Sequence, residues 1–334
     1  MKIYEFKINP LSGFGTPLVG DTLFGHLCWQ LCYDPALGDS TLDDLLSDYR
    51  LNPFVILSSA YPRIDSGGSV CYAFRRPDMP LSLLFDNPSG DPAEMIEKRK
   101  ELKKRKWMLL DELFLADGFN DAMFVTDEYL FKLSTLNSKA SKYLVSFSQP
   151  RNKINRFTGT TGEGDFAPFN VVQDIYALGS SLSVFAGIDN GRISAESILE
   201  GLKRIGATGY GRDASTGLGR FEVAGFREVN FGSHANANAC YTLSPSLPGN
   251  TVWHDIFFTP VIRYGRHGGG LAGSRNPFKA PVRMADSGAV YVSNVDLPVL
   301  PYIGSSVSGV SIADSRSVVQ AYSLYIPFRM EVTI

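Results

Sequence analysis

The sequence has little of what marks several common classes of protein. Its 334 residues carry 32 Lys and Arg against 34 Asp and Glu, so the net charge is only −2. Bulk charge therefore does not indicate a nucleic-acid-binding protein, and such a function would need basic residues gathered locally. No apolar run approaches the ~18 residues that span a bilayer, and the opening MKIYEFKINP lacks the apolar core of a signal peptide. We expect a cytoplasmic protein without membrane contact.

Cysteine and histidine are scarce as well. The four cysteines form no C-x-x-C pair, which favours free thiols in a reducing compartment; they are Cys28, Cys32, Cys71 and Cys240. The four histidines lack the spacing of a metal site; they are His26, His234, His254 and His267. The G-x-S-x-G of a serine hydrolase is absent too. We therefore expect no catalytic residue, no metal and no cofactor.

The first part of the chain alternates strand and helix patterns. Residues 2–8 alternate with period 2, as in a strand. Asp21 is expected to cap a helix whose apolar stripe includes Cys28 and Cys32, which are therefore expected to be core thiols. The apolar run 54–61 predicts a second strand.

The same order returns before residue 226. Residues 181–188 resemble a strand, Ser194 is expected to cap a helix, and Gly206 is expected just past its end. Residues 219–226 then predict a closing strand. A β-α-β unit, a large insertion and a second β-α-β unit form the ferredoxin-like order that RNA-recognition modules share.

The sequence predicts an α+β protein of two domains. Residues 1–226 would form a ferredoxin-like domain with the insertion in 34–170, and the β-rich residues 227–334 would form a second one. Within the insertion, Asp91 and Pro92 predict the start of a helix through residue 115. It holds seven basic residues between Lys98 and Lys106, either a solvated helix face or a contact surface for nucleic acid or an acidic partner.

The stretch GATGYGRDASTGLGRFEV (206–223) concentrates five glycines between Gly206 and Gly219. A dinucleotide fingerprint must follow a strand and open a helix, whereas this loop follows a helix and precedes a strand. It also lacks the Lys-Ser/Thr pair of a P-loop. What remains is an ordinary flexible loop or a glycine-rich nest whose exposed amides, with Arg212 and Arg220, bind phosphate.

A second basic stretch, SQPRNKINRFTGTTGEGDF (148–166), mixes cations with amides and hydroxyls. Ile154 and Phe157 stand among the basic residues and could wedge against bases. An extended hairpin of this composition suits single-stranded RNA, although a plain surface loop is the alternative.

Four segments together resemble one family. In chain order they are GTPLVGDTLFGHLCW (15–29), RNKINRFTGTTGEGDF (151–166), GATGYGRDASTGLGRFEV (206–223) and NPFKAPVRMADSGAVY (276–291). They resemble the RAMP proteins of type III CRISPR effector complexes. More narrowly, DTLFGHLCW and TGTTGEG resemble the crRNA 5′-handle-binding subunit of the Csm-type (III-A) complex.

The resemblance implies a non-catalytic subunit with two ferredoxin-like (RRM-like) domains and an inserted thumb-like hairpin that kinks the guide RNA. Such subunits grip the 5′ handle of the crRNA. They dock the large subunit that makes cyclic oligoadenylate and contact a backbone RAMP subunit. Target RNA is engaged only indirectly, because the backbone neighbours carry the nuclease aspartate.

The resemblance also implies RNA-binding residues, carried over onto the matching positions. The Gly-rich loop supplies Gly209, Tyr210, Gly211, Arg212, Ser215, Thr216, Gly217 and Gly219, and the loop before the first helix supplies Ser12 and Thr16. The basic stretch supplies Arg151, Asn152, Lys153, Arg156 and Thr158, and the C-terminal motif supplies Arg275 and Lys279. Two positions depart from the family pattern. Asp165 stands where members often have a small or apolar residue, and Lys279 is a single lysine where two adjacent lysines are common.

Two alternatives stay open. The chain could be a RAMP protein of another type III subtype, which would still bind RNA. It could also be a metal-independent RAMP endoribonuclease that processes precursor crRNA, with His26 or His254 as the base and Asp255 beside the latter.

Overall fold

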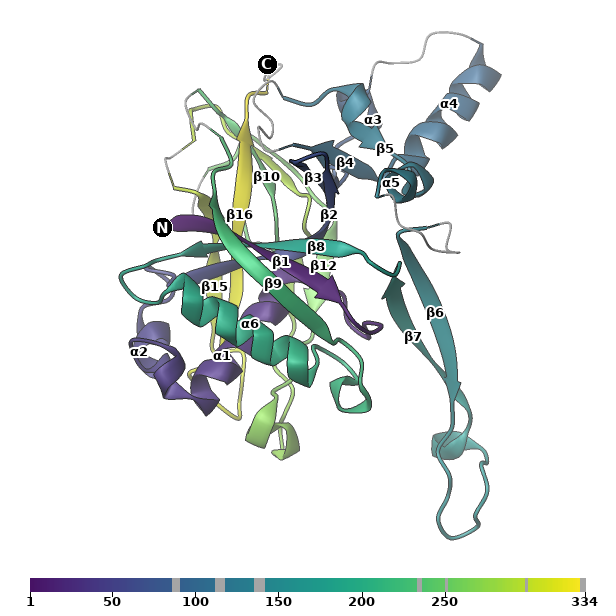
Figure 1. The fold of residues 1–334 in the computed structure, drawn as a ribbon, viewed down its shortest axis with the longest axis vertical. Helices are drawn as coiled ribbons and strands as arrows, with labels where there is room; N and C mark the ends of the chain where they lie inside the picture. The colour runs from purple at the N-terminus through teal and green to yellow at the C-terminus, as the bar shows by residue number, and fades with distance from the viewer. Residues whose placement is uncertain are drawn as a thin grey trace.

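The computed structural model describes residues 1–85, 91–111, 118–134, 142–232, 236–249, 252–297 and 300–330. Its strands form a seven-stranded sheet, a five-stranded sheet and two two-stranded ribbons, and neighbouring strands in the described residues are antiparallel. The α-helices are α1 (Gly20–Tyr33), α2 (Leu42–Ser47), α3 (Leu81–Leu84), α4 (Pro92–Lys104), α5 (Asp127–Leu133) and α6 (Ala195–Thr208). The α+β class is confirmed (Figure 1).

The seven-stranded sheet has the order β5-β4-β3-β2-β8-β1-β9. Its strands are β1 (Lys2–Pro10), β2 (Val55–Ser66), β3 (Ser69–Arg75), β4 (Trp107–Leu110), β5 (Phe124–Val125), β8 (Ser181–Ile188) and β9 (Phe221–Val229). The four strands predicted from the pattern, β1, β2, β8 and β9, are confirmed and lie side by side. Part of the expected insertion continues this sheet, because β3, β4 and β5 extend it beyond β2.

Helix α1 packs against β2 and against β16 (Val318–Phe328) of the second sheet. Its predicted apolar stripe is confirmed, with Leu23, Phe24 and Leu27 buried. The predicted cap is wrong, because the helix begins at Gly20 with Val19 before it. Asp21 instead lies nearly buried, 3.3 Å from Arg263 Nε.

The thiols of α1 differ from each other. Cys28 is partly buried, and burial raises its pKa to about 12. Cys32 is exposed, so the prediction that it lies in the core is wrong. The last turn of α1 leaves that side chain beyond the packed stripe.

Helix α6 covers β9 and contacts α1. Its predicted cap is confirmed, since Ser194 Oγ accepts a hydrogen bond from Ser197 N at 3.1 Å. The helix continues past Gly206 to Thr208, and Gly209 is its C-cap with φ of 102°. Gly206 therefore lies inside the last turn, so its predicted position past the helix end is wrong.

The basic helix is shorter than predicted. It ends at Lys104, and residues 107–110 form β4, where burial alternates with period 2 and Met108 and Leu110 point inward. The expected helical residues 112–115 lie outside the described part of the chain. Pro92 is in the first turn as predicted, whereas Asp91 makes no side-chain capping hydrogen bond.

The C-terminal part is β-rich. Its five-stranded sheet has the order β11-β14-β10-β16-β15, with β10 (Ala239–Thr242), β11 (Asp255–Phe257), β14 (Val290–Val292) and β15 (Tyr302–Ser308) beside β16. Strands β12 (Pro260–Arg263) and β13 (Val282–Ala285) form a separate ribbon. Among the described residues after 227, the regular elements are strands and one 3-10 helix (Gly269–Gly273), with no α-helix.

The two parts of the chain share one hydrophobic core. Buried residues of α1 and of the first sheet belong to the same cluster as Leu243, Tyr322 and Leu324. Buried Gln320 of β16 also donates to Leu57 O at 2.8 Å and accepts from Leu57 N at 2.9 Å, where β2 is irregular. The division at residues 226 and 227 stays a prediction.

A long hairpin leaves the body of the protein (Figure 1). Strand β6 (Leu144–Arg151) pairs with β7 (Phe169–Tyr176), and the loop between them contains most of the predicted basic stretch. The described helices include none that is both long and apolar enough to cross a membrane.

Candidate nucleic-acid interface

Three segments that are distant in sequence meet beside the end of α6. They are the loop between β1 and α1 (11–19), the Gly-rich loop (209–220) and the paired strands of the β6–β7 hairpin (Leu144–Arg151 with Phe169–Tyr176), which we call the hairpin base. Ser12 Oγ accepts from Arg220 N at 2.9 Å, and Thr16 Oγ1 accepts from Arg212 N at 3.0 Å. The structure therefore brings Ser12 and Thr16 to the Gly-rich loop, with their hydroxyls engaged by its backbone.

The glycines of the loop are required by the loop's own backbone conformation, and one of them also leaves the backbone open to a ligand. Gly209, Gly211, Gly217 and Gly219 all have positive φ, between 72° and 102°. At Gly219 an added Cβ would lie 2.1 Å from Tyr210 O, so the chain itself occupies that space. At Gly217 an added Cβ would meet nothing within 4 Å. Gly217 is therefore the position where a ligand can approach the backbone.

Tyr210 is a core residue of this arrangement. Its side chain is fully buried, its hydroxyl donates to Pro17 O at 2.8 Å, and Val19 N donates to that hydroxyl at 3.1 Å. Burial raises the pKa of this phenol well above its usual value. Tyr210 was predicted to contact RNA, but its side chain is not accessible to RNA in this conformation, because its ring fastens the loop to the start of α1.

His26 fixes the same loop from the side of α1. Its Nε2 accepts a hydrogen bond from Gly211 N at 3.1 Å, and its ring centre lies 5.0 Å from that of Tyr210. Burial lowers the pKa of His26 to about 4. The imidazole is therefore neutral at pH 7 and a weak base, with one nitrogen already occupied.

The base of the hairpin is tied to the Gly-rich loop by charge. Arg151 lies 3.2 Å from the carboxylate of Asp213, and Arg212 donates to Val172 O on β7. A short backbone bridge joins Phe14 to Asp174. Arg151 is consequently only 26% exposed, and its charge is shared with Asp213 before any ligand arrives.

Beyond this base the predicted hairpin residues face solvent. Phe157 is fully exposed and Ile154 is 62% exposed. Thr158 and Thr160 share a hydroxyl hydrogen bond of 3.0 Å. Four of the predicted RNA-binding residues of the stretch are exposed, Asn152, Lys153, Arg156 and Thr158, and in the Gly-rich loop the exposed polar residues are Arg212, Ser215, Thr216 and Arg220. Within the described part of the chain, Lys153, Arg156 and Arg220 form no ion pair.

The two C-terminal candidates lie on a separate surface. Arg275 is exposed, whereas Lys279 is half-buried beside Gly265, and burial lowers the pKa of its ammonium. The backbone N of Lys279 donates to Gly265 O at 2.8 Å. Helix α1 lies between this surface and the Gly-rich loop, since His26 reaches Gly211 on one side and Trp29 packs near Gly268 on the other.

Sequence reasoning missed several residues of this second surface. Tyr264 is 71% exposed and Phe278 is 64% exposed, and the guanidinium of Arg266 lies 5.5 Å from the ring centre of Phe278. Arg283 is exposed on β13. Exposed rings among cations are typical of surfaces that bind single-stranded nucleic acid. The available signal was the absence of Asp and Glu from residues 256–285.

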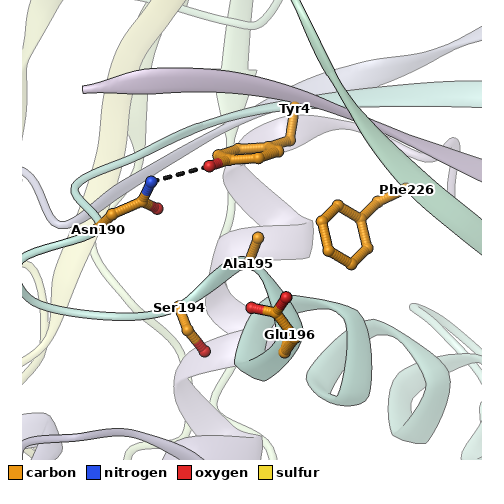
Figure 2. A pocket seen from close by; sticks show the side chains of 6 residues that line it. All are labelled: Tyr4, Asn190, Ser194, Ala195, Glu196 and Phe226. Atoms are coloured by element: carbon orange, nitrogen blue, oxygen red, sulfur yellow. Dashed lines mark hydrogen bonds between the residues drawn. The ribbon is translucent and has the colours of Figure 1, made fainter.

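A pocket of about 270 Å³ lies elsewhere, at the start of α6 (Figure 2). Asn190 donates to the hydroxyl of Tyr4 at 2.8 Å, and the pocket is completed by Phe226, Ser194, Ala195 and Glu196. It contains a carboxylate and no cation, so it does not favour phosphate. None of the predicted RNA-binding residues lines it.

Comparison with known proteins gave matches among solved structures alone. Neither a protein-family model nor a curated protein sequence matches the chain. A chain of "Crystal structure of Csm1-Csm4 cassette in complex with cA4" aligns with TM-score 0.54 and 18% identity over 100% of both chains. A chain of "Crystal structure of Csm1-Csm4 cassette in complex with pppApA" aligns with TM-score 0.53 and 18% identity, over 100% of this chain and 99% of that one.

A third match comes from a different assembly. A chain of "Crystal structure of Csm3-Csm4 subcomplex in the type III-A CRISPR-Cas interference complex" aligns with TM-score 0.55 and 13% identity, over 99% of this chain and 100% of that one. Csm4 is the component that all three assemblies share. From end to end, this chain has the fold of chains from Csm1-Csm4 and Csm3-Csm4 assemblies of CRISPR-Cas complexes.

Proposed function

We propose that this chain is a non-catalytic RNA-binding subunit of a type III-A CRISPR effector complex, and that it grips the 5′ handle of the crRNA. The observation that carries the proposal is the convergence of the Gly-rich loop, the β1–α1 loop and the hairpin base. Together they present an open backbone at Gly217 beside exposed cations. The full-length match to Csm4-containing structures supports the same function.

A fixed RNA handle requires a shaped surface more than a large net charge. Backbone amides, hydroxyls and a few arginines position a phosphate chain, and stacking surfaces hold the bases. Ser215, Thr216 and Arg220 are exposed on the loop, and Phe157 is exposed near the tip of the hairpin. A net charge of −2 limits indiscriminate RNA binding while leaving these local cations free.

The proposed partners are a large cyclic-oligoadenylate-synthesising subunit and a backbone RAMP subunit. The matched structures pair Csm4 with Csm1 in one assembly and with Csm3 in the other. In this proposal the chain has two ferredoxin-like domains, and the β6–β7 hairpin acts as the thumb that kinks the guide. The first of those domains is supported by the order β2-β8-β1-β9 with α1 and α6 as the connecting helices.

The proposal includes no catalytic role. His26 is occupied by Gly211 N and has a pKa near 4, which makes it a poor general base at neutral pH. His254 lies 2.9 Å from Asp255 at the surface, and no contact joins that pair to the Gly-rich loop among the described residues.

The test measures the affinity of purified protein for handle RNA as a function of salt. Arg156→Gln with Arg220→Gln removes two exposed cations, while Lys132→Gln with Lys203→Gln removes two exposed cations away from the interface. We expect the first variant to bind more weakly and to reduce the slope of log K against log salt by about 1.4, since each phosphate contact on a single strand contributes ~0.7. The control should keep the affinity and slope of the unmodified protein.

If the two variants bind handle RNA with the same affinity and the same salt slope, the proposed interface is wrong. Metal-free cleavage of repeat RNA that disappears in His26→Ala or His254→Ala would replace the proposal with the endoribonuclease alternative.

A further inference from the structure

Helix α4 projects from the body of the protein and is held at its C-terminal end (Figure 1). The guanidinium of Arg76 donates to Leu102 O at 2.9 Å and to Arg105 O at 3.1 Å. Leu102 packs against the core, and Met95 is partly buried. The remaining described side chains between Glu94 and Lys104 are exposed, so most of the helix surface faces solvent.

Most of the charges on α4 are separated by sign, with Lys98 as the exception because it lies beyond the glutamates. At about 100° per residue, Arg99, Lys100, Lys103 and Lys104 share one face of roughly 140°. Glu97 and Glu101 lie on the neighbouring row, one turn apart. The cationic face is directed away from Leu102, which marks the side that contacts the body.

The four cations of this face, which we call the α4 ridge, are not neutralised within the chain. In the described part of the protein, Arg99, Lys100, Lys103 and Lys104 form no ion pair within 4 Å. Arg99 with Lys103, and Lys100 with Lys104, are like charges at i and i+4, an arrangement that destabilises a helix by a few tenths of a kcal/mol for each pair. A face of this kind gains most from an external polyanion.

The composition of the ridge favours a phosphate backbone over a protein partner. Three of its four cations are lysines, and lysine is depleted at the centres of protein interfaces. One large apolar side chain, Ile96, lies among the cations of the ridge and is exposed, and no aromatic residue occurs in α4. Interfaces between proteins usually depend on buried aromatic or apolar anchors, whereas phosphate contacts require mainly Lys and Arg.

We propose that the α4 ridge is a second, sequence-independent RNA-binding surface that contacts the phosphate backbone of a strand outside the handle. It goes beyond the proposed function, because the ridge lies toward the opposite end of the molecule from the loop that follows α6 (Figure 1). The two surfaces would hold different stretches of RNA, and each can be disabled without altering the other.

The test uses the full-length protein and a uridine oligomer that lacks the handle sequence. Arg99, Lys100, Lys103 and Lys104 are all replaced with Gln, which keeps the helix and removes the ridge. The control replaces Glu97 and Glu101 with Gln on the same helix. Circular dichroism and the urea midpoint confirm that both variants fold.

The ridge variant should bind the oligomer more weakly, and its salt slope should fall by up to about 2.8, or ~0.7 for each lost phosphate contact. The control should bind as well as the unmodified protein or better. If the ridge variant binds the oligomer with unchanged affinity and salt slope, the proposal is wrong. It is also wrong if the salt slope for the oligomer is unchanged while the variant no longer binds an acidic partner subunit. The variant Arg156→Gln with Arg220→Gln leaves the ridge intact, so its binding of handle RNA tests the handle interface independently of the ridge.

Discussion

The two glycines at the ends of the 217–219 segment should respond differently to alanine. Both have positive φ, 95° at Gly217 and 72° at Gly219, which an L-residue adopts at a cost of roughly 1–2 kcal/mol. The space around them differs. A Cβ at Gly217 meets nothing within 4 Å, whereas a Cβ at Gly219 would lie 2.1 Å from Tyr210 O and 2.6 Å from Tyr210 N.

Gly217→Ala should therefore lower the free energy of unfolding by only about 1–2 kcal/mol. Gly219→Ala adds a clash with the main chain, and overpacking of this kind costs a further ~1–3 kcal/mol. Urea unfolding followed by circular dichroism measures both variants under the same conditions. Handle-RNA affinity should fall for Gly217→Ala, because its new methyl group occupies the open approach. If the two variants lose equal free energy of unfolding, the close contact between position 219 and the main chain of Tyr210 is refuted.

Three further outcomes follow from the same contacts. The free energy of unfolding should fall as the pH drops from about 6.5 toward about 4, by up to roughly 3 kcal/mol from His26 alone, because His26 binds a proton in the unfolded chain at a higher pH than in the folded protein. In His26→Gln, whose side-chain oxygen can still accept from Gly211 N, this pH dependence should be weaker. A pH dependence that is unchanged in the variant would contradict the prediction. Tyr210→Phe should lower stability by roughly 1–3 kcal/mol in urea unfolding, since Val19 N and Pro17 O lose their partner; no change would show that water replaces the hydroxyl. Arg151→Ala should increase amide hydrogen exchange at the loop end of β6 and β7, because the link to Asp213 is lost, and unchanged exchange of both strands would rule out that anchor.

Much of the first sheet could be predicted because each strand carries its own signal. Period-2 alternation marks β1, and apolar runs mark β2 and β8, so local pattern was sufficient. Ser194 was recognisable as a cap for the same reason. Such features depend on neighbours within a few residues.

The failures depend on contacts between distant segments. The sequence on both sides of Trp107–Leu110 has helical propensity, yet these four residues pair with β3 and form a strand. Tyr210 resembles an exposed aromatic residue among glycines, and only its hydrogen bonds to Pro17 and Val19, nearly 200 positions earlier, make it a core residue. The pairing of Arg151 with Asp213, 62 positions apart, is equally invisible in local sequence.

If RNA lies against the Gly-rich loop, a photoreactive group placed within the loop should cross-link to that RNA. Ser215 is exposed beside Gly217, so a photoreactive side chain introduced there faces the proposed path of the RNA. The protein is then co-expressed with the other subunits and a crRNA precursor, irradiated, and the cross-linked nucleotides are mapped. We expect cross-links to nucleotides of the 5′ handle. Cross-links confined to other parts of the guide, or a complex that retains crRNA with no cross-link from this position, would contradict it.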